Sequence, residues 1–142
     1  MITRTYVETS ALLLACLQRN APMRKALANA KWPITSSLTA IEAIRAPRRR
    51  LANGQITAAQ AAAAITAAQA YLARCELIGL TRRVRELATH GFPDDNLRTG
   101  DAIQIASVQI AAELASVEVL VTDERVLRNC MALGFKVVAV GR

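Results

Sequence analysis

The chain has 142 residues, enough for one domain with a core of two or three layers. Its residues are 53% hydrophobic but only 4% aromatic, which favours closely packed helices over an all-β sandwich. The formal net charge is +7, and arginine supplies all but three of the 18 basic residues, so we expect an anionic partner such as nucleic acid. We predict a single domain over residues 1–142.

Export, membrane insertion and histidine- or thiol-based chemistry are disfavoured. No apolar run is long enough to span a membrane. The segment that ends at Cys16 resembles a lipoprotein cleavage box, but Glu8 interrupts the short apolar stretch before it. The three cysteines are widely spaced and His90 is the single histidine, so a reduced, cytoplasmic protein is expected.

The first third of the chain alternates short β-prone segments with helices. We predict strands at 5–7 and 32–36 and helices at 11–19, 22–30 and 38–52. Thr9 or Ser10 is expected to cap the first of these helices, and Ser37 opens the third. Asn53 and Gly54 end that third helix.

The remainder continues this alternation. The alanine-rich segment 57–74 is predicted to be a helix capped by Thr57, followed by a strand at 76–80 and a short basic helix at 81–89. Residues 90–98 form a loop. Helices at 101–115 and 124–133, the latter closed by Gly134, flank a buried strand at 117–121, and a last strand covers 136–140.

Strands separated by helices along the whole chain indicate an α/β fold. We predict three α/β/α layers around a mostly parallel sheet of four to five strands. In such sheets, functional residues gather at the carboxyl ends of the strands. The sequence contains no internal repeat and no long linker.

Four acids are candidates for a functional site. Glu8 ends the first predicted strand and Asp123 follows the fourth, while Asp101 lies in the first turn of a helix and Glu42 lies one turn inside another. Each has an ordinary alternative: Asp101 could interact with the helix dipole, Glu42 could be solvated, and Asp123 could be a helix cap.

The sequence around these acids favours a metal site. Glu8 follows an apolar strand, and Glu42 and Asp101 adjoin isoleucine and alanine, so these carboxylates lie against a predicted core. Converging carboxylates repel one another unless a cation balances their charge. Ligands that are all oxygen suit Mg²⁺ or Mn²⁺ rather than Zn²⁺.

Five ordered segments resemble the motifs of PIN domains. At 6–12, a strand is followed by an acid, two hydroxyl residues and an apolar run, and at 36–42 a helix carries a Glu. The segments 97–106 and 119–127 each carry an Asp, and 134–138 has a Gly-apolar-x-Val ending. They occur in family order at family spacing over nearly the full chain. Length and basic charge are similar to those of VapC toxins of bacterial toxin–antitoxin pairs.

This resemblance implies a PIN-like fold, Mg²⁺- or Mn²⁺-dependent ribonuclease activity, inhibition by a cognate antitoxin and formation of a homodimer. It implies that Glu8, Glu42 and Asp101 are metal ligands and that Asp123 serves a second metal or the attacking water. Thr9, Ser10 and Thr122 could orient these carboxylates, or could act as helix caps.

Glu8 departs from the family pattern, which has Asp at this position. The added methylene moves the carboxylate by about 1.5 Å, and Mg²⁺ tolerates little geometric error. One alternative is therefore a catalytically weak PIN protein that binds RNA or a protein partner.

A basic rim is expected beside an acidic site that handles RNA. Two clusters are candidates, and a solvated helix face would explain either of them: Arg45, Arg48, Arg49 and Arg50, and Arg82, Arg83 and Arg85.

A phospho-acceptor receiver domain is a second alternative. It would need adjacent acids after the first strand and a lysine after a late strand. Thr9 and Ser10 follow Glu8 instead, and Lys136 begins the last predicted strand, so this alternative is disfavoured.

Overall fold

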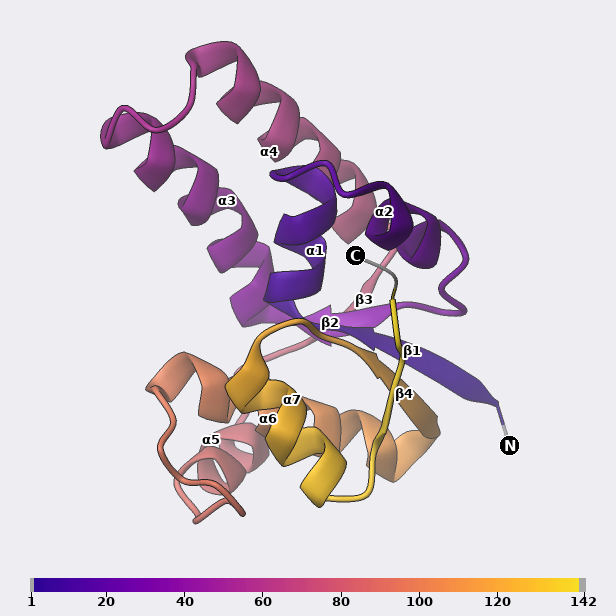
Figure 1. Ribbon diagram of the computed structural model, residues 1–142. Coiled ribbons are helices and arrows are strands. Elements are labelled where there is room, and N and C mark those ends of the chain that lie inside the picture. The colour runs from indigo at the N-terminus through magenta and orange to yellow at the C-terminus, as the bar shows by residue number, and fades with distance from the viewer. Residues whose placement is uncertain (1, 141–142) are drawn as a thin grey trace.

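The computed structural model describes residues 2–140, which form five strands and seven helices (Figure 1). The strands are β1 (Thr3–Val7), β2 (Ile34–Ser36), β3 (Glu76–Ile78), β4 (Ser116–Leu120) and β5 (Lys136–Val137). The helices are α1 (Thr9–Cys16), α2 (Ala21–Ala28), α3 (Ser37–Ala52), α4 (Ala58–Leu72), α5 (Arg82–Ala88), α6 (Thr99–Leu114) and α7 (Glu124–Ala132). Every predicted element is present, with ends that differ by a few residues.

All five strands are parallel and lie in the order β3-β2-β1-β4-β5. Central strand β1 pairs with β4 from Thr3 opposite Ser116 to Val7 opposite Leu120. The chain proceeds from β1 to β2 and β3 on one side, then returns to the other side of β1 at β4. This reversal is a topological switch point, beside which parallel sheets bind ligands at their carboxyl edge.

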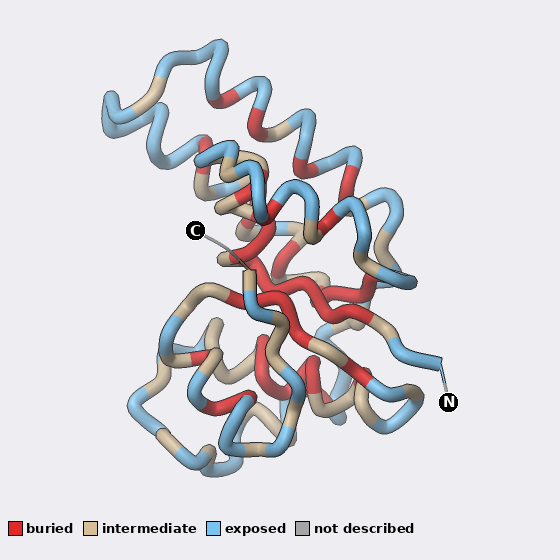
Figure 2. The backbone as a smooth tube through the Cα atoms, turned by 45° about the vertical axis from the view of Figure 1, so that its right-hand side comes forward, coloured by how far each residue is buried: buried red, intermediate tan, exposed pale blue. Residues whose placement is uncertain are grey.

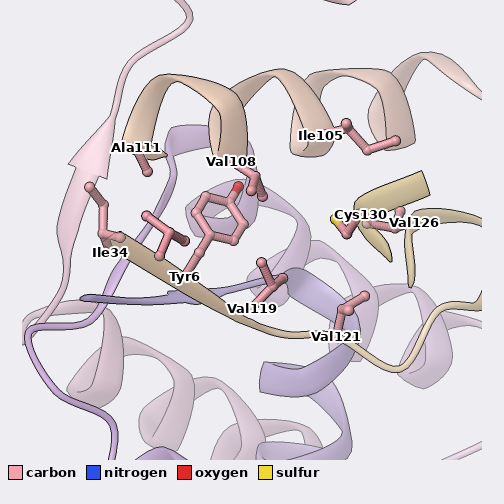
Figure 3. Close-up of a cluster of buried hydrophobic side chains, with 10 residues drawn as sticks. Tyr6, Ile34, Ile105, Val108, Ala111, Val119, Val121, Val126 and Cys130 are labelled. Carbon is pink, nitrogen blue, oxygen red and sulfur yellow. The ribbon is translucent and has the colours of Figure 1, made fainter. Parts of the chain in front are cut away.

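Alternate side chains of the central strands enter two cores on opposite faces of the sheet. Tyr6 and Val119 pack with residues of α6 and α7 (Figure 3), whereas Val7 and Leu120 pack with residues of α1, α2, α3 and α4. Figure 1 shows α1–α4 on one face and α5–α7 on the other, and Figure 2 shows buried backbone concentrated along the strands between them. The predicted three-layer α/β/α architecture is confirmed, and the sheet is parallel throughout.

The predicted start of α1 was wrong in one respect, because Glu8 caps this helix rather than Thr9 or Ser10. The backbone of Glu8 is extended (φ −82°, ψ 154°), and its side chain turns back to accept a hydrogen bond from the backbone N–H of Ser10. Similarly, Ser36 rather than Ser37 caps α3, while Thr57 caps α4 as predicted.

Gly134 ends α7 as predicted. Its φ of +88° is left-handed, a conformation that glycine adopts without side-chain strain. The N–H groups of Gly134 and Phe135 bond to the carbonyls of Met131 and Cys130, which turns the chain directly into β5. None of the helices within residues 2–140 is long and apolar enough to cross a membrane.

Candidate active site

Glu8 lies at the carboxyl end of β1, beside the end of β4. Its backbone N–H bonds to the carbonyl of Leu120 at 2.9 Å, which extends the pairing of the two strands by one residue. The side chain is 4% exposed, and its Oε2 accepts hydrogen bonds from the backbone N–H of Ser10 at 2.8 Å and from the Ser10 hydroxyl. The fold therefore holds a carboxylate almost out of solvent at the switch point.

The Ser10 hydroxyl joins the ends of the two central strands. It donates to Glu8 and accepts from the backbone N–H groups of Thr122 at 2.9 Å and Asp123 at 3.0 Å. A hydroxyl has one proton and two lone pairs, and here all three are used. Ser10 therefore fixes Glu8 relative to the segment that carries Asp123, and Thr122 contributes its backbone N–H to this network.

The electrostatic environment of Glu8 disfavours its charged form. The pKa of its carboxyl group is raised from 4.5 to about 7. Burial is the largest cause, the two Ser10 hydrogen bonds act in the opposite direction, and the nearby carboxylates of Asp123 and Glu42 add to the rise. Asp123 and Glu42 thus both lie within electrostatic reach of Glu8. A bound cation would remove the repulsion among them.

Glu42 projects from α3 toward the first turn of α6. Its Oε1 accepts hydrogen bonds from the Thr9 hydroxyl at 2.8 Å and from the Gln104 amide at 3.2 Å. A Cβ at Gly100 would lie 3.4 Å from Glu42 Oε2, so the first turn of α6 comes against this carboxylate. Asp101 is the next residue in that turn.

Asp101 and Asp123 also have the ordinary structural roles that their positions indicated. Asp101 Oδ2 accepts from the backbone N–H of Arg98 at 3.3 Å, at the start of α6. Asp123 Oδ1 accepts from the backbone N–H groups of Arg125 and Val126, both at 3.1 Å, and so caps α7. A cap accepts through one carboxylate oxygen and does not preclude a second role for the other.

The donor chemistry at this edge fits a hard divalent cation, since the candidate groups are carboxylates and one of them, Glu8, is buried near two like charges. Among residues 2–140, however, no group of three or more His, Cys, Asp or Glu side chains is arranged to hold a metal ion. Each candidate carboxylate instead accepts at least one hydrogen bond from the protein itself: Glu8, Glu42, Asp101 and Asp123.

Sequence reasoning missed a buried polar cluster beneath Glu42. Tyr6, Thr39 and Gln104 are each less than 2% exposed, and together with Thr9 they connect β1, α1, α3 and α6 through hydrogen bonds. A usable signal was present, because Gln104 is a polar residue between two isoleucines, one helical turn after Asp101.

The first basic cluster lies beside a groove between α1 and α3. A cavity of about 220 Å³ is lined by Glu42, Arg45 and Arg49 among others. A neighbouring cavity of about 570 Å³ shares Arg49 and extends past Arg50 to Asn20. Arg48 is exposed but lines neither cavity.

The second basic cluster is engaged in contacts around α5. Arg82 pairs with Glu86 on the same helix at 3.0 Å, and Arg83 pairs with Glu113 of α6. Arg85 donates to the carbonyl of Leu80 at 2.7 Å. The groove beside Glu42 is therefore the better candidate for binding an anionic backbone.

The chain is similar to known proteins over nearly its whole length. It is 34% identical over 145 aligned residues to Ribonuclease VapC35 of Mycobacterium tuberculosis strain CDC 1551, covering 96% of this chain and 97% of that protein, and the values for strain H37Rv are the same. A solved chain of a toxin–antitoxin complex from Klebsiella pneumoniae has a TM-score of 0.64 at 15% identity, covering 95% of this chain and 96% of that chain, which supports the shared fold. No family model matches the chain. Identity of 34% over nearly the full length of both proteins shows that the chain belongs to the VapC-type family of PIN-domain toxin ribonucleases.

Proposed function

We propose that this chain is a metal-dependent endoribonuclease and the toxin of a type II toxin–antitoxin pair. The observation that supports this most strongly is the position of Glu8 and Asp123 at the switch point of a chain that belongs to the VapC family. The proposal includes an RNA substrate, a cognate antitoxin, a homodimer and action in the cytoplasm. The similarity to a chain from a toxin–antitoxin complex supports the antitoxin partner.

The four acids are the residues that we propose hold Mg²⁺ or Mn²⁺: Glu8, Glu42, Asp101 and Asp123. When bound, the ion would polarise a phosphodiester and lower the pKa of a water molecule. When the cation binds, the four carboxylates would exchange the hydrogen bonds that they now accept from the protein, or would share these oxygens with the cation.

The surrounding residues orient the acids and hold the substrate. Ser10 fixes the Glu8 carboxylate and Thr9 fixes that of Glu42, each through a hydroxyl donor. The oxygen of Asp123 that does not cap α7 is proposed to orient the attacking water. Arg45 and Arg49, on the wall of the groove, would bind phosphates of the RNA backbone.

A catalytically weak PIN protein that binds RNA or a partner is a second candidate function. Glu8 favours it, because this residue stands where the family has Asp and its Oε2 is already bound by Ser10. Its pKa of about 7 also leaves a substantial fraction protonated near neutral pH in the absence of a cation.

Cleavage of RNA by the native protein, Glu8→Asp and Asp101→Asn, each with Mg²⁺ and with a chelator, separates the two functions. A metal-dependent nuclease should lose its activity in chelator. The cleavage rate of Asp101→Asn should fall by at least about 100-fold, because loss of a metal ligand should cost more than loss of an outer-sphere partner, which lowers activity by about 10–100-fold. Glu8→Asp tests whether the longer side chain limits the rate. Equal rates for the native protein and Asp101→Asn would rule out the proposed enzyme.

A further inference from the structure

A chain of buried hydrogen bonds connects the core to Glu42. The Tyr6 hydroxyl donates to Gln104 Oε1 at 2.6 Å. Gln104 Nε2 lies 3.0 Å from the Thr9 hydroxyl, 2.9 Å from the Thr39 hydroxyl and 3.2 Å from Glu42 Oε1. Burial of polar groups is costly unless they form hydrogen bonds. The side chains of this cluster are therefore held in the orientations that make these bonds.

Tyr6 determines which way the Gln104 amide faces. A phenol is an O–H donor at neutral pH, and the Tyr6 hydroxyl lies 2.6 Å from Gln104 Oε1, so it marks that atom as the acceptor oxygen of the amide. Figure 3 shows the Tyr6 ring beside Val108, with its hydroxyl directed toward α6. If the amide rotated by half a turn, its oxygen would face the carboxylate oxygen of Glu42, and two acceptors would oppose each other. The NH₂ group is therefore held toward Glu42.

This arrangement distinguishes the two oxygens of Glu42. Oε1 is held by the Thr9 hydroxyl and the Gln104 amide. Oε2 faces the first turn of α6, where a Cβ at Gly100 would approach to 3.4 Å. We propose that Gln104, oriented by Tyr6, is a positioning residue that fixes Glu42 for metal binding; this inference rests on the proposed nuclease function.

Gln104 also links the two helices that carry proposed ligands. It lies three residues after Asp101 on α6, so the two residues share one face of that helix. Its bonds to Thr39 and Glu42 cross to α3. Gln104 therefore fixes Asp101 and Glu42 relative to each other, in addition to orienting one carboxylate.

The test is calorimetric titration of Mn²⁺ into the native protein, Gln104→Met, Tyr6→Phe and a control, Gln109→Met. The control has the same substitution on the same helix, at an amide whose buried Oε1 has no hydrogen-bond partner among the described residues. We expect Gln104→Met to weaken Mn²⁺ binding by about 10–100-fold, as for other outer-sphere partners of metal ligands. Tyr6→Phe should weaken it in the same direction by a smaller factor, and Gln109→Met should bind as the native protein does.

A purely structural role would appear differently. It would lower the urea midpoint of Gln104→Met while leaving the Mn²⁺ affinity of the folded fraction unchanged, and that result would overturn the inference. If Gln104→Met does not fold, native affinity in folded Tyr6→Phe would overturn it instead. A native protein that binds no Mn²⁺ would contradict the proposed function, and this inference with it, whereas equal affinities in native protein and Gln104→Met would contradict only the role of Gln104.

Discussion

Glu8 is buried at the carboxyl end of the central strand, and its position has an energetic cost. Its side chain is 4% exposed, and burial followed by repulsion from Asp123 and Glu42 raises its pKa to about 7. The two hydrogen bonds from Ser10 offset part of that cost. In the metal-free protein, the protonated form of Glu8 is therefore favoured by folding.

This favoured protonation gives a pH dependence of stability. A carboxyl group whose pKa is raised on folding stabilises the protein most below its unfolded pKa, and the stabilisation is lost as pH rises through the folded pKa. For Glu8, the loss from pH 4.5 to about 7 is roughly 3 kcal/mol. In chelator, the free energy of unfolding measured with urea should fall between about pH 5 and about pH 7 for the native protein, and should fall much less for Glu8→Gln. Parallel pH curves for the two proteins would show that Glu8 does not titrate in this way.

Helix caps determine where the site residues lie at the scale of the elements. Asp123 caps α7, Glu8 caps α1, and Asp101 accepts a hydrogen bond at the start of α6. Three proposed ligands therefore stand at helix N-termini, where the unpaired N–H groups favour negative charge. The same carboxylates contribute to folding and to the proposed chemistry.

Two substitutions of Asp123 separate these contributions. Asn is as good a cap as Asp, whereas Ala removes the acceptor for two backbone N–H groups, so Asp123→Ala should cost about 1 kcal/mol more stability than Asp123→Asn. Both substitutions remove the charge and should lower RNA cleavage alike. Urea unfolding and cleavage assays on the pair measure the two effects. Full activity in Asp123→Asn would remove this carboxylate from the proposed site.

The order and type of the elements could be predicted from the sequence because hydrophobic periodicity and turn residues act locally. Gly134 is an example, since a left-handed residue after α7 is a local requirement. Glu8 as a cap could not be predicted, because cap preferences favour the short side chains of Thr9 and Ser10 and the longer Glu must curl back to act. Strand order was also not predictable, because it depends on pairing between distant segments.

At the scale of the whole molecule, the return of the chain to β4 places residues from both ends of the sequence together. Glu8 and Asp123 approach because β1 and β4 pair along their full length. The acids could be nominated from their motifs, and Gln104 stands out as a polar residue between two isoleucines. Its bonding to Tyr6 and Thr39 could not be predicted, because these bonds join three elements that are distant in the chain. Apolar neighbours along the chain do not indicate which distant residues bond to a buried amide.

The groove beside Glu42 predicts how RNA binding depends on salt. Arg45 and Arg49 line it, whereas Arg82 and Arg83 are paired with Glu residues around α5. Each lost phosphate contact with single-stranded RNA should reduce the slope of log affinity against log salt by about 0.7. We therefore expect that, in the Asp101→Asn variant with chelator present, replacing Arg45 and Arg49 with Gln flattens the slope by about 1.4. Replacing Arg82 and Arg83 should leave the slope nearly unchanged. Equal effects of the two replacements would contradict a groove-specific contact.

The most direct measurement is anomalous X-ray scattering from crystals of the native protein grown with Mn²⁺. The account predicts a manganese peak at the carboxyl edge of β1 and β4, coordinated by oxygens of the four proposed ligands: Glu8, Glu42, Asp101 and Asp123. In the same crystals, Gln104 should still donate to Glu42. Saturating Mn²⁺ with no peak at this edge, or a peak held by other residues, would contradict the proposed metal site.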